Sequence, residues 1–497
     1  MATQKRPPII VVMGHIDHGK STLLDTIRNT NIVATEAGGI TQHLSAYTVS
    51  HTSTEHGERS LTFLDTPGHA SFQKMRLRGA DVADIAVLIV SAEDAVMPQT
   101  LEALAAIKEA SIPYIVAINK IDKPNADLVR TQSSLIENEI FIEGMGGDIP
   151  WVAISAKQGT GIPELLDTLI LTAELAEVEG DPAAPAVGTV IEGNLDKKRG
   201  IAATIIIKNG TIHGGSFVVS EHSFAPVRIM ENTFGKQVRE AGLSEPVEII
   251  GWNDVPRAGA TFTTVKTKKE AEAAVYSFKE AKTIARNAIT TRRPFSAIPL
   301  VPVVIKADTL GSIEAITTEI EKLKNDRIEL KIVSASIGDI SLTDIQNANA
   351  TQNAIVVGFH TKLDRTAEEL AERLSVATAT FDIIYDLAEW MKNMIDARLP
   401  RKEEEVASGK VKILRHFSAQ KNVHVMGGKV LEGAMSIKQR VHIMRHDIKL
   451  GSGIVENLQQ SKSNVERVES GEFGMQIATR VDVSEGDFLV PFTVVVS

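Results

Sequence analysis

The residues best suited to chemistry form one short run, Gly14-His15-Ile16-Asp17-His18-Gly19-Lys20-Ser21. Its spacing fits the phosphate-loop pattern G-x-x-x-x-G-K-[ST]. Glycines let such a loop curl until its backbone N–H groups face an anion, and a following helix adds the dipole of its N-terminus. We expect Lys20 to reach the β- and γ-phosphates of a nucleotide and the Ser21 hydroxyl to bind Mg²⁺ directly.

Two later segments could complete the phosphate end of this site. Asp65 and Gly68 belong to Asp65-Thr66-Pro67-Gly68-His69, and they fit a water-mediated Mg²⁺ partner and a backbone sensor of the γ-phosphate. Thr41 follows the pair Gly38-Gly39, and a segment of this kind can become ordered when its threonine reaches Mg²⁺ and the γ-phosphate. Each segment alone is also typical of an ordinary turn or surface loop.

Two further segments fit the recognition of a base, Asn119-Lys120-Ile121-Asp122 and Ser155-Ala156-Lys157. The Asp122 carboxylate can accept hydrogen bonds from N1–H and the exocyclic amino group of guanine, and adenine has no matching donors. Asn119 and Lys120 are expected to brace the base and the loop. A backbone N–H of the second segment is expected to bind the guanine O6. These motifs, in this order after a phosphate loop, predict a guanine-nucleotide site.

The elements that must position these motifs are short apolar runs, at residues 9–13, 61–64, 85–90, 114–118 and 151–154. Helical patterns such as 100–110 and 163–178 lie between them. This alternation predicts a doubly wound, mostly parallel sheet. Such a sheet binds ligands at the carboxyl ends of its strands, where the motifs fall.

Four segments resemble the bacterial translation initiation factor two family: residues 14–20, 37–43, 65–69 and 96–100. The Gly-Gly-Ile-Thr-Gln-His sequence at 38–43 is the most specific of them, because it separates this family from elongation factors. The resemblance implies that His69 orients or activates the attacking water. It also implies that Ile16 and Ile40 form an apolar gate in front of His69. His15 and His18 are expected to shape the loop.

The motifs and the resemblance together give one predicted catalytic residue, His69, and a set of positions expected to contact GTP or GDP. These positions are Gly14, His15, Ile16, Asp17, His18, Gly19, Lys20, Ser21, Thr41, Asp65, Gly68, Asn119, Lys120, Asp122, Ser155, Ala156 and Lys157. Ser21 and Thr41 are the expected direct ligands of Mg²⁺.

The rest of the chain predicts a multidomain α/β and β architecture. A GTP-binding domain at 1–179 is followed by a β-barrel at 187–267, a second α/β domain at 298–384, a helical linker at 385–409 and a C-terminal β-barrel at 410–497. Asn209-Gly210 predicts a hairpin between two strands of the first barrel. Gly427-Gly428 and Gly451-Ser452-Gly453 predict turns in the second. The second α/β domain has no Gly-Lys pair of its own, so no second nucleotide site is expected.

The C-terminal domain departs from the family pattern. By resemblance it holds the formylmethionyl end of initiator tRNA, and Gly427, Gly428 and 472–474 could shape a pocket. The family usually has cysteines near Met426–Lys429 and Phe473, and a Lys-Arg-Tyr triplet where this chain has Gln459-Gln460-Ser461. The change removes two cations and an aromatic ring that could pair with phosphate and stack on a base. Selectivity for the formylated end therefore stays open.

Composition narrows the class of protein. The chain has 497 residues, no cysteine and a net charge of −10, with mean hydropathy near zero. Absence of cysteine excludes disulfides and thiolate metal sites, and a cytoplasmic protein without a membrane span is the simplest interpretation. Residues 410–497 carry 12 Lys and Arg against 9 Asp and Glu, which favours this end for RNA contact. A solvated barrel surface is the alternative.

The resemblance implies a GTPase that places initiator tRNA on the small ribosomal subunit and then promotes joining of the large subunit. Off the ribosome it is expected to be a monomer. Because no arginine finger is evident in the chain, slow hydrolysis accelerated by the ribosome is expected. Two alternatives stay open, namely an elongation-type GTPase carrying aminoacyl-tRNA and a ribosome-binding protein that GTP merely orders. The 38–43 segment and the second α/β domain argue against the first alternative.

Overall fold

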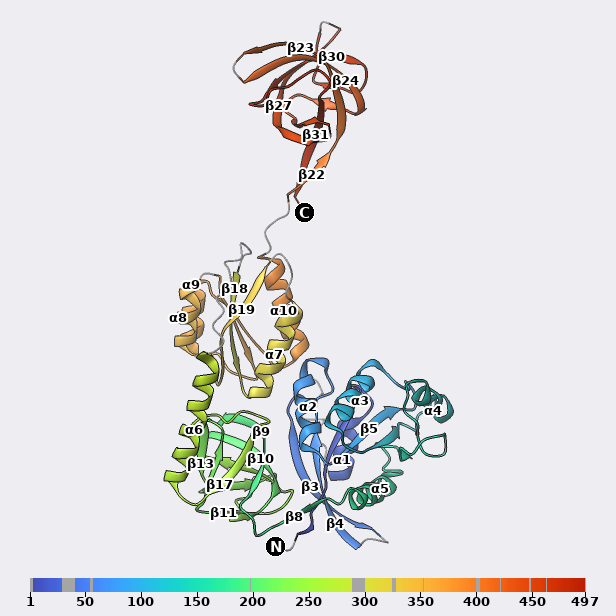
Figure 1. The fold of residues 1–497 in the computed structure, drawn as a ribbon, viewed down its shortest axis with the longest axis vertical. Helices are drawn as coiled ribbons and strands as arrows, with labels where there is room; N and C mark the ends of the chain where they lie inside the picture. The colour runs from blue at the N-terminus through green and yellow to red at the C-terminus, as the bar shows by residue number, and fades with distance from the viewer. Residues whose placement is uncertain are drawn as a thin grey trace. The chain divides into compact units, whose positions relative to one another are not determined.

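The structure is a computed structural model that describes residues 3–28, 41–53, 57–196, 198–287, 300–323, 328–351, 353–398, 403–420, 422–446, 448–461 and 463–496. The chain forms two compact units, Met1–Ala397 and Arg398–Ser497 (Figure 1). The first contains three large sheets with their helices and two two-stranded sheets, and the second is a β-barrel. No helix in the described part of the chain is long and apolar enough to span a membrane.

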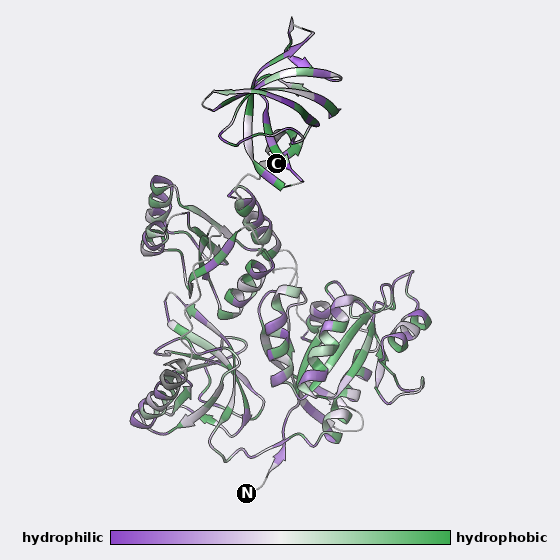
Figure 2. Cartoon of the chain, turned by 45° about the horizontal axis from the view of Figure 1, so that its top comes forward, coloured by the Kyte–Doolittle hydropathy of each residue, from purple (hydrophilic) through white to green (hydrophobic). Residues whose placement is uncertain are grey.

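A six-stranded sheet organises the N-terminal part of the first unit. Its order is β3(Ser45–Ser53), β4(Gly57–Asp65), β2(Ile9–Gly14), β5(Ile85–Ser91), β6(Tyr114–Asn119) and β7(Trp151–Ala153). Only the β3–β4 pair is antiparallel. The predicted doubly wound, mostly parallel sheet is therefore confirmed. Figure 2 shows hydrophobic residues concentrated along these strands.

Helices cover both faces of this sheet because successive strand residues point to opposite sides. Val11 and Met13 pack in the core under α2(Gln73–Val82) and α3(Pro98–Ala110), whereas Ile10 and Val12 pack in the core under α1(Lys20–Arg28) and α5(Ile162–Leu175). The remaining helix of this part is α4(Leu128–Glu137). Full burial of β2 on both faces fixes the loop that follows it.

The second part is a seven-stranded antiparallel sheet. Its order is β13(Ser223–Pro226), β12(Phe217–Ser220), β17(Thr261–Val265), β9(Val187–Asp196), β10(Gly200–Asn209), β16(Pro246–Ile250) and β14(Ile229–Asn232). The hairpin predicted at Asn209-Gly210 is wrong, because β10 pairs with β9 and β16, and β12 pairs with β13 and β17. The Gly210 N–H instead donates to the Asp181 carbonyl of the preceding linker, 3.2 Å away.

Helix α6(Lys268–Asn287) covers β12 and leads to the third part; residues 288–299 lie outside the described residues. There a four-stranded parallel sheet has the order β19(Glu329–Ile337), β18(Leu300–Ala307), β20(Ile355–Phe359) and β21(Ala377–Phe381). Its helices are α7(Leu310–Lys322), α8(Leu342–Ala350), α9(Arg365–Leu374) and α10(Ile384–Asp396).

The prediction of a helical linker over 385–409 is wrong in its second half. Helix α10 ends at Asp396 and contacts α7, β20 and β21, so it belongs to the third part. Residues of β22(Glu403–Ala407) form a strand that pairs with β31(Phe488–Val496) in the C-terminal unit. Pro400 lies outside the described residues. The local sequence at 403–407 predicts a helix, but this segment forms a strand because it pairs with β31.

The C-terminal unit is a closed antiparallel barrel of six strands. They are β31, β23(Gly409–Gln420), β24(Val423–Gly433), β30(Glu472–Ala478), β27(Ile448–Gln460) and β26(Arg440–Arg445), and the β26–β31 pair closes the ring. The turns predicted at Gly427-Gly428 and Gly451-Ser452-Gly453 are wrong, because these residues lie inside β24 and β27. A Cβ built on Gly428 would lie 2.3 Å from Met475 Cε, so close packing explains this glycine.

Candidate functional site

The loop between β2 and α1 requires its two glycines. Gly14 and Gly19 have φ angles of +150° and +92°. A Cβ at Gly14 would lie 2.4 Å from the Ile89 carbonyl oxygen, and one at Gly19 would lie 2.4 Å from Asn119 Nδ2. Only glycine combines this backbone with such close neighbours. The loop is thus held against β5 and β6, at the carboxyl ends of the parallel strands.

Lys20, the first residue of α1, is buried beneath this loop. Its Nζ donates to the carbonyl oxygens of His15, at 2.7 Å, and Gly14, at 3.1 Å. A Cβ on Gly68 would lie 2.6 Å from the same Nζ. Burial lowers the pKa of Lys20 to about 8, and the nearby Asp65 carboxylate opposes that shift. Phosphate loop and Gly68 segment therefore meet at one ammonium group.

The histidines of the loop have structural contacts. His18 is fully buried; its Nδ1 accepts from the Ser91 N–H at 3.3 Å, and burial lowers its pKa to about 4. The His15 ring lies 4.9 Å from the His18 ring, centroid to centroid. Between them, the Ile16 N–H donates to Gln99 Oε1 at 2.9 Å. Asp17 adopts a left-handed backbone with φ of +64°.

Three oxygen ligand positions converge beside Lys20. Ser21 Oγ lies 2.8 Å from Thr41 Oγ1, which donates to Asp65 Oδ2 at 3.4 Å. They come from α1, the segment before β3 and the end of β4. Hydroxyl and carboxylate oxygens are the donors that Mg²⁺ prefers, so the predicted residues fit this ion. Of the same predicted segment, Gly38, Gly39 and Ile40 lie outside the described residues.

Asn119 connects the phosphate loop to the two predicted base segments. Its Nδ2 donates to the His18 carbonyl at 2.8 Å, and its Oδ1 accepts from the Ala156 N–H at 2.9 Å. Asp122 Oδ1 accepts from Ser155 Oγ at 2.7 Å, and this bond lowers the pKa of the Asp122 carboxyl, which keeps it anionic at neutral pH.

The two predicted lysines of the base segments lie nearer solvent. Lys120 Nζ lies 3.6 Å from the carboxylates of both Glu93 and Asp94. Lys157 is exposed at the end of its segment. Both residues thus lie in the two segments predicted to contact the base.

His69 begins a short 3-10 helix, η2(Ala70–Phe72), and its side chain caps that helix. Its Nδ1 accepts from the Ser71 N–H at 3.2 Å, and its ring meets the Tyr385 ring edge-on, with centroids 4.3 Å apart. Burial lowers the pKa of His69, which favours the neutral imidazole. Ser71 Oγ in turn donates to Glu319 of α7. The predicted catalytic residue is therefore held by groups of the third part.

Three residues at this site were missed by sequence reasoning: Arg76, Glu319 and Tyr385. Arg76 is almost fully buried, and its Nη1 donates to the carbonyl oxygens of Pro67, at 3.3 Å, and His69, at 2.5 Å. No motif signals these residues, because their contacts arise from packing of α2, α7 and α10 around the Gly68 segment. Ile16 is one of the two residues expected to form the apolar gate. Its Cγ1 lies 3.1 Å from a Cβ built on Gly68.

A phosphate loop, converging Mg²⁺-type oxygens and a guanine-type base loop define a phosphate-loop nucleotide-binding protein of the GTPase class. Three family models match the chain: Elongation factor Tu GTP binding domain at residues 5–174, Elongation factor G domain 2 at 185–265, and Translation-initiation factor 2 at 276–392.

Individual proteins are similar along nearly all of the chain. Translation initiation factor IF-2 of Carboxydothermus hydrogenoformans is 41% identical, over 99% of this chain and 60% of its own length. IF-2 of Pelotomaculum thermopropionicum is 40% identical, over 99% of this chain and 51% of its length. The chain belongs to the translation initiation factor 2 family of translational GTPases. It spans between half and three fifths of the length of these two relatives.

A solved structure, GDP-bound aIF5B from Aeropyrum pernix, is 27% identical and covers 98% of this chain and 92% of its own, with a TM-score of 0.47.

Proposed function

We propose that this chain binds GTP and GDP with Mg²⁺ and hydrolyses GTP to GDP and phosphate during the initiation of translation. The observation that carries the proposal is the meeting of Lys20, Gly68 and the oxygens of Ser21, Thr41 and Asp65 at one place. The match of residues 5–174 to the Elongation factor Tu GTP binding domain supports the same activity.

In the proposed mechanism, the amides of the phosphate loop and the Lys20 ammonium hold the β- and γ-phosphates. Mg²⁺, when bound, neutralises charge on these phosphates, with Ser21 and Thr41 as direct ligands and Asp65 acting through water. The Gly68 N–H contacts the γ-phosphate. His69 orients the attacking water through its imidazole, whose Nδ1 accepts from the Ser71 N–H in this structure.

Recognition of guanine is assigned to Asp122. Its carboxylate, oriented by Ser155, accepts from N1–H and the amino group of the base. The Asn119 side chain fixes the loop at the correct distance because it bonds both the phosphate loop and the Ala156 amide. Since that amide already donates to Asn119, the guanine O6 needs an amide of this segment that is either free or released on binding.

The proposed partners are the small ribosomal subunit, initiator tRNA and then the large subunit. In the C-terminal barrel, β24 and β30 place Gly427 beside Gly474 and Gly428 beside Phe473. Phe417 is 61% exposed, and its ring lies 3.3 Å from a Cβ built on Gly427. The exposed Phe417 ring next to Gly427 offers a surface for the end of a tRNA. It would take the place of the Lys-Arg-Tyr triplet that this chain lacks. Phe473 itself is buried and packs in the barrel core.

The experiment that tests the proposed nucleotide site changes the base that the site prefers, from guanine to xanthine. Asp122→Asn replaces the acceptor of the guanine N1–H by an amide, which can donate to the 2-oxo group of xanthine. We expect this variant to lose GTP affinity and gain affinity for xanthosine triphosphate, measured by competition against a fluorescent nucleotide. Asp127→Asn, in the nearby N-cap of α4, is the matched control and should keep its preference for GTP. Unchanged GTP preference in Asp122→Asn would contradict the proposed site.

A further inference from the structure

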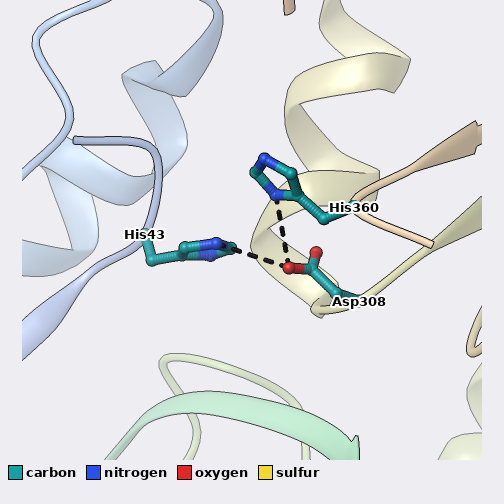
Figure 3. Close-up of side chains that lie close together, drawn as sticks. All are labelled: His43, Asp308 and His360. Atoms are coloured by element: carbon teal, nitrogen blue, oxygen red, sulfur yellow. Dashed lines mark ion pairs between the residues drawn. The ribbon is translucent and has the colours of Figure 1, made fainter. Parts of the chain in front are cut away.

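We propose that His43, Asp308 and His360 form a binding site for a divalent transition-metal ion of the Zn²⁺ class. The three residues come from the segment before β3, from the end of β18 and from the end of β20. Figure 3 shows both imidazoles next to the same oxygen of the carboxylate. One ligand atom from each residue lies within 4.8 Å of those of the other two.

The spacing of these atoms suits a metal better than a hydrogen bond. His43 Nε2 and His360 Nδ1 each lie 3.3 Å from Asp308 Oδ2. Charge-assisted N–H···O bonds are about 2.7–2.9 Å long. Ligands at about 2.0–2.1 Å from a tetrahedral Zn²⁺ are separated from one another by about 3.3–3.4 Å. Both measured separations therefore match edges of a zinc tetrahedron.

The tautomer of His360 also favours a metal site. Its Nε2 lies 2.9 Å from the Asp382 carbonyl oxygen, which can only accept, so Nε2 carries a proton. In a neutral ring Nδ1 then presents a lone pair on the side of Asp308. Nδ1 is buried, and the polar atom that it faces is Asp308 Oδ2, 3.3 Å away. Metal-ligating histidines commonly donate their second N–H to a backbone carbonyl in this way.

The Asp308 carboxylate is also oriented to bind a metal ion. Asp308 Oδ1 accepts from Ser312 Oγ at 2.8 Å, which leaves Oδ2 facing both imidazoles. His360 is held in a left-handed backbone with φ of +50°, and its N–H donates to the Phe381 carbonyl at 2.9 Å. The ligand side chains are 42%, 26% and 17% exposed for His43, Asp308 and His360, so an ion can enter from solvent.

The ligand set selects the class of ion. Two imidazole nitrogens and one carboxylate favour Zn²⁺, Co²⁺ or Ni²⁺ over Mg²⁺, which prefers oxygen ligands. Three protein ligands leave a fourth position for water. Since His43 lies two residues after Thr41, the bound ion would connect that segment of the nucleotide site to the third part of the chain. The site is separate from the Mg²⁺ position in both ligands and chemistry.

The test is a Co²⁺ titration of the untagged full chain in excess Mg²⁺, followed by visible absorption. We expect one saturable equivalent with the bands of a four-coordinate site, which Zn²⁺ then displaces. The chain has no cysteine, so thiolate bands cannot obscure the signal. Absence of saturable binding would overturn the proposal, because the three residues would then be an ion-paired contact only.

Variants locate the ion. His360→Asn and Asp308→Asn should each weaken Co²⁺ binding by about 100-fold or more, since even outer-shell changes cost about 10–100-fold. His416→Asn is the matched control, because His416 Nε2 and His424 Nδ1 form another close histidine pair, 3.2 Å apart. Loss of binding in His416→Asn with retention in His360→Asn would also overturn the proposal. Unchanged GTP affinity and circular dichroism of His360→Asn would show that the variant is folded.

Discussion

The six-stranded and the four-stranded sheets of the first unit share one local arrangement, but different groups lie at the helix N-terminus in each. In each, a buried strand ends in a loop that leads into a helix, α1 after β2 and α7 after β18. At α1 the helix begins with Lys20, and the preceding loop has two glycines with positive φ, which suit a phosphate. At α7 the amide of Gly311 donates to Glu192 Oε1 of β9 at 3.1 Å, and Thr309 caps the helix. The second helix end thus binds a carboxylate of the chain itself.

This difference is the reason that we propose a nucleotide site at the six-stranded sheet and none at the four-stranded sheet. A helix N-terminus attracts any anion, and what fills it depends on the neighbouring groups. Glu192 is buried between β9 and α7, so the N-terminus of α7 serves packing between two parts of the chain. Substitutions on α1 should therefore change nucleotide binding, whereas substitutions at the N-terminus of α7 should change the stability of the fold.

The largest effect is expected for His69→Ala. Loss of a group that positions the attacking water should lower ribosome-stimulated GTP hydrolysis by about 10²–10⁴-fold. GTP affinity should stay near that of the wild type, because His69 contacts Ser71 and Tyr385 and no residue of the phosphate loop in the described contacts. Single-turnover release of phosphate with ribosomes measures the rate. A variant with the wild-type rate would mean that hydrolysis does not use His69.

Lys20→Ala should weaken binding of GTP by about 2–5 kcal/mol, because the phosphates lose a buried cation. Equilibrium titration with a fluorescent GTP analogue measures the change. Lys157→Ala is the control, since Lys157 is exposed and should affect binding far less. Equal losses in the two variants would contradict the difference between a phosphate site and an exposed loop.

Glu192→Gln should change the pH dependence of stability. Burial raises the pKa of Glu192 to about 7, above 4.5 for an ordinary glutamate. A raised pKa means that its contribution is fully present below pH 4.5 and is lost as pH rises through 7. The wild type should therefore lose about 2–3 kcal/mol relative to Glu192→Gln between pH 4.5 and 8. Urea unfolding of both proteins at the two pH values measures this difference.

The control for that experiment is Glu314→Gln, whose partly exposed carboxylate pairs with the buried Arg78 guanidinium. It should show no comparable pH-dependent gain. If Glu192→Gln tracks the wild type at both pH values, the carboxylate at the N-terminus of α7 is not a buried anion site.

The smallest effect is expected for Thr309→Ala. Thr309 accepts from the Ser312 N–H at 3.2 Å as the N-cap of α7, and removing such a cap costs about 1 kcal/mol. Thermal unfolding should show the loss, and Thr309→Ser should restore most of it. Intrinsic GTP hydrolysis should not change, because α7 contributes no phosphate ligand.

The sequence allowed prediction of the sites that depend on strand ends. Motifs after β2, β4 and β6 lie on loops whose place is fixed as soon as the strands are parallel, so the partners Lys20, Asp65 and Asn119 could be named in advance. Contacts made by Tyr385 and Glu319 could not, because they depend on how the third part packs against His69.

The errors have one physical cause, which is that pairing over long distances overrides local preference. Asn209-Gly210 is a strong hairpin signal, yet β16 rather than β12 pairs beside β10. Gly427-Gly428 resembles a turn, yet both residues pair with β30 along a strand. The charged residues at 403–407 follow a helical pattern and become a strand because β31 lies alongside.

The central claim is that the strand ends of the first sheet form a GTPase site. The most direct measurement is the rate of GTP hydrolysis by the purified full chain with Mg²⁺, in the presence and absence of ribosomes carrying initiator tRNA. The account predicts slow hydrolysis alone, strong stimulation by the ribosome, and loss of both after Mg²⁺ is removed. Hydrolysis that stays at background with ribosomes, or that continues without Mg²⁺, would contradict it.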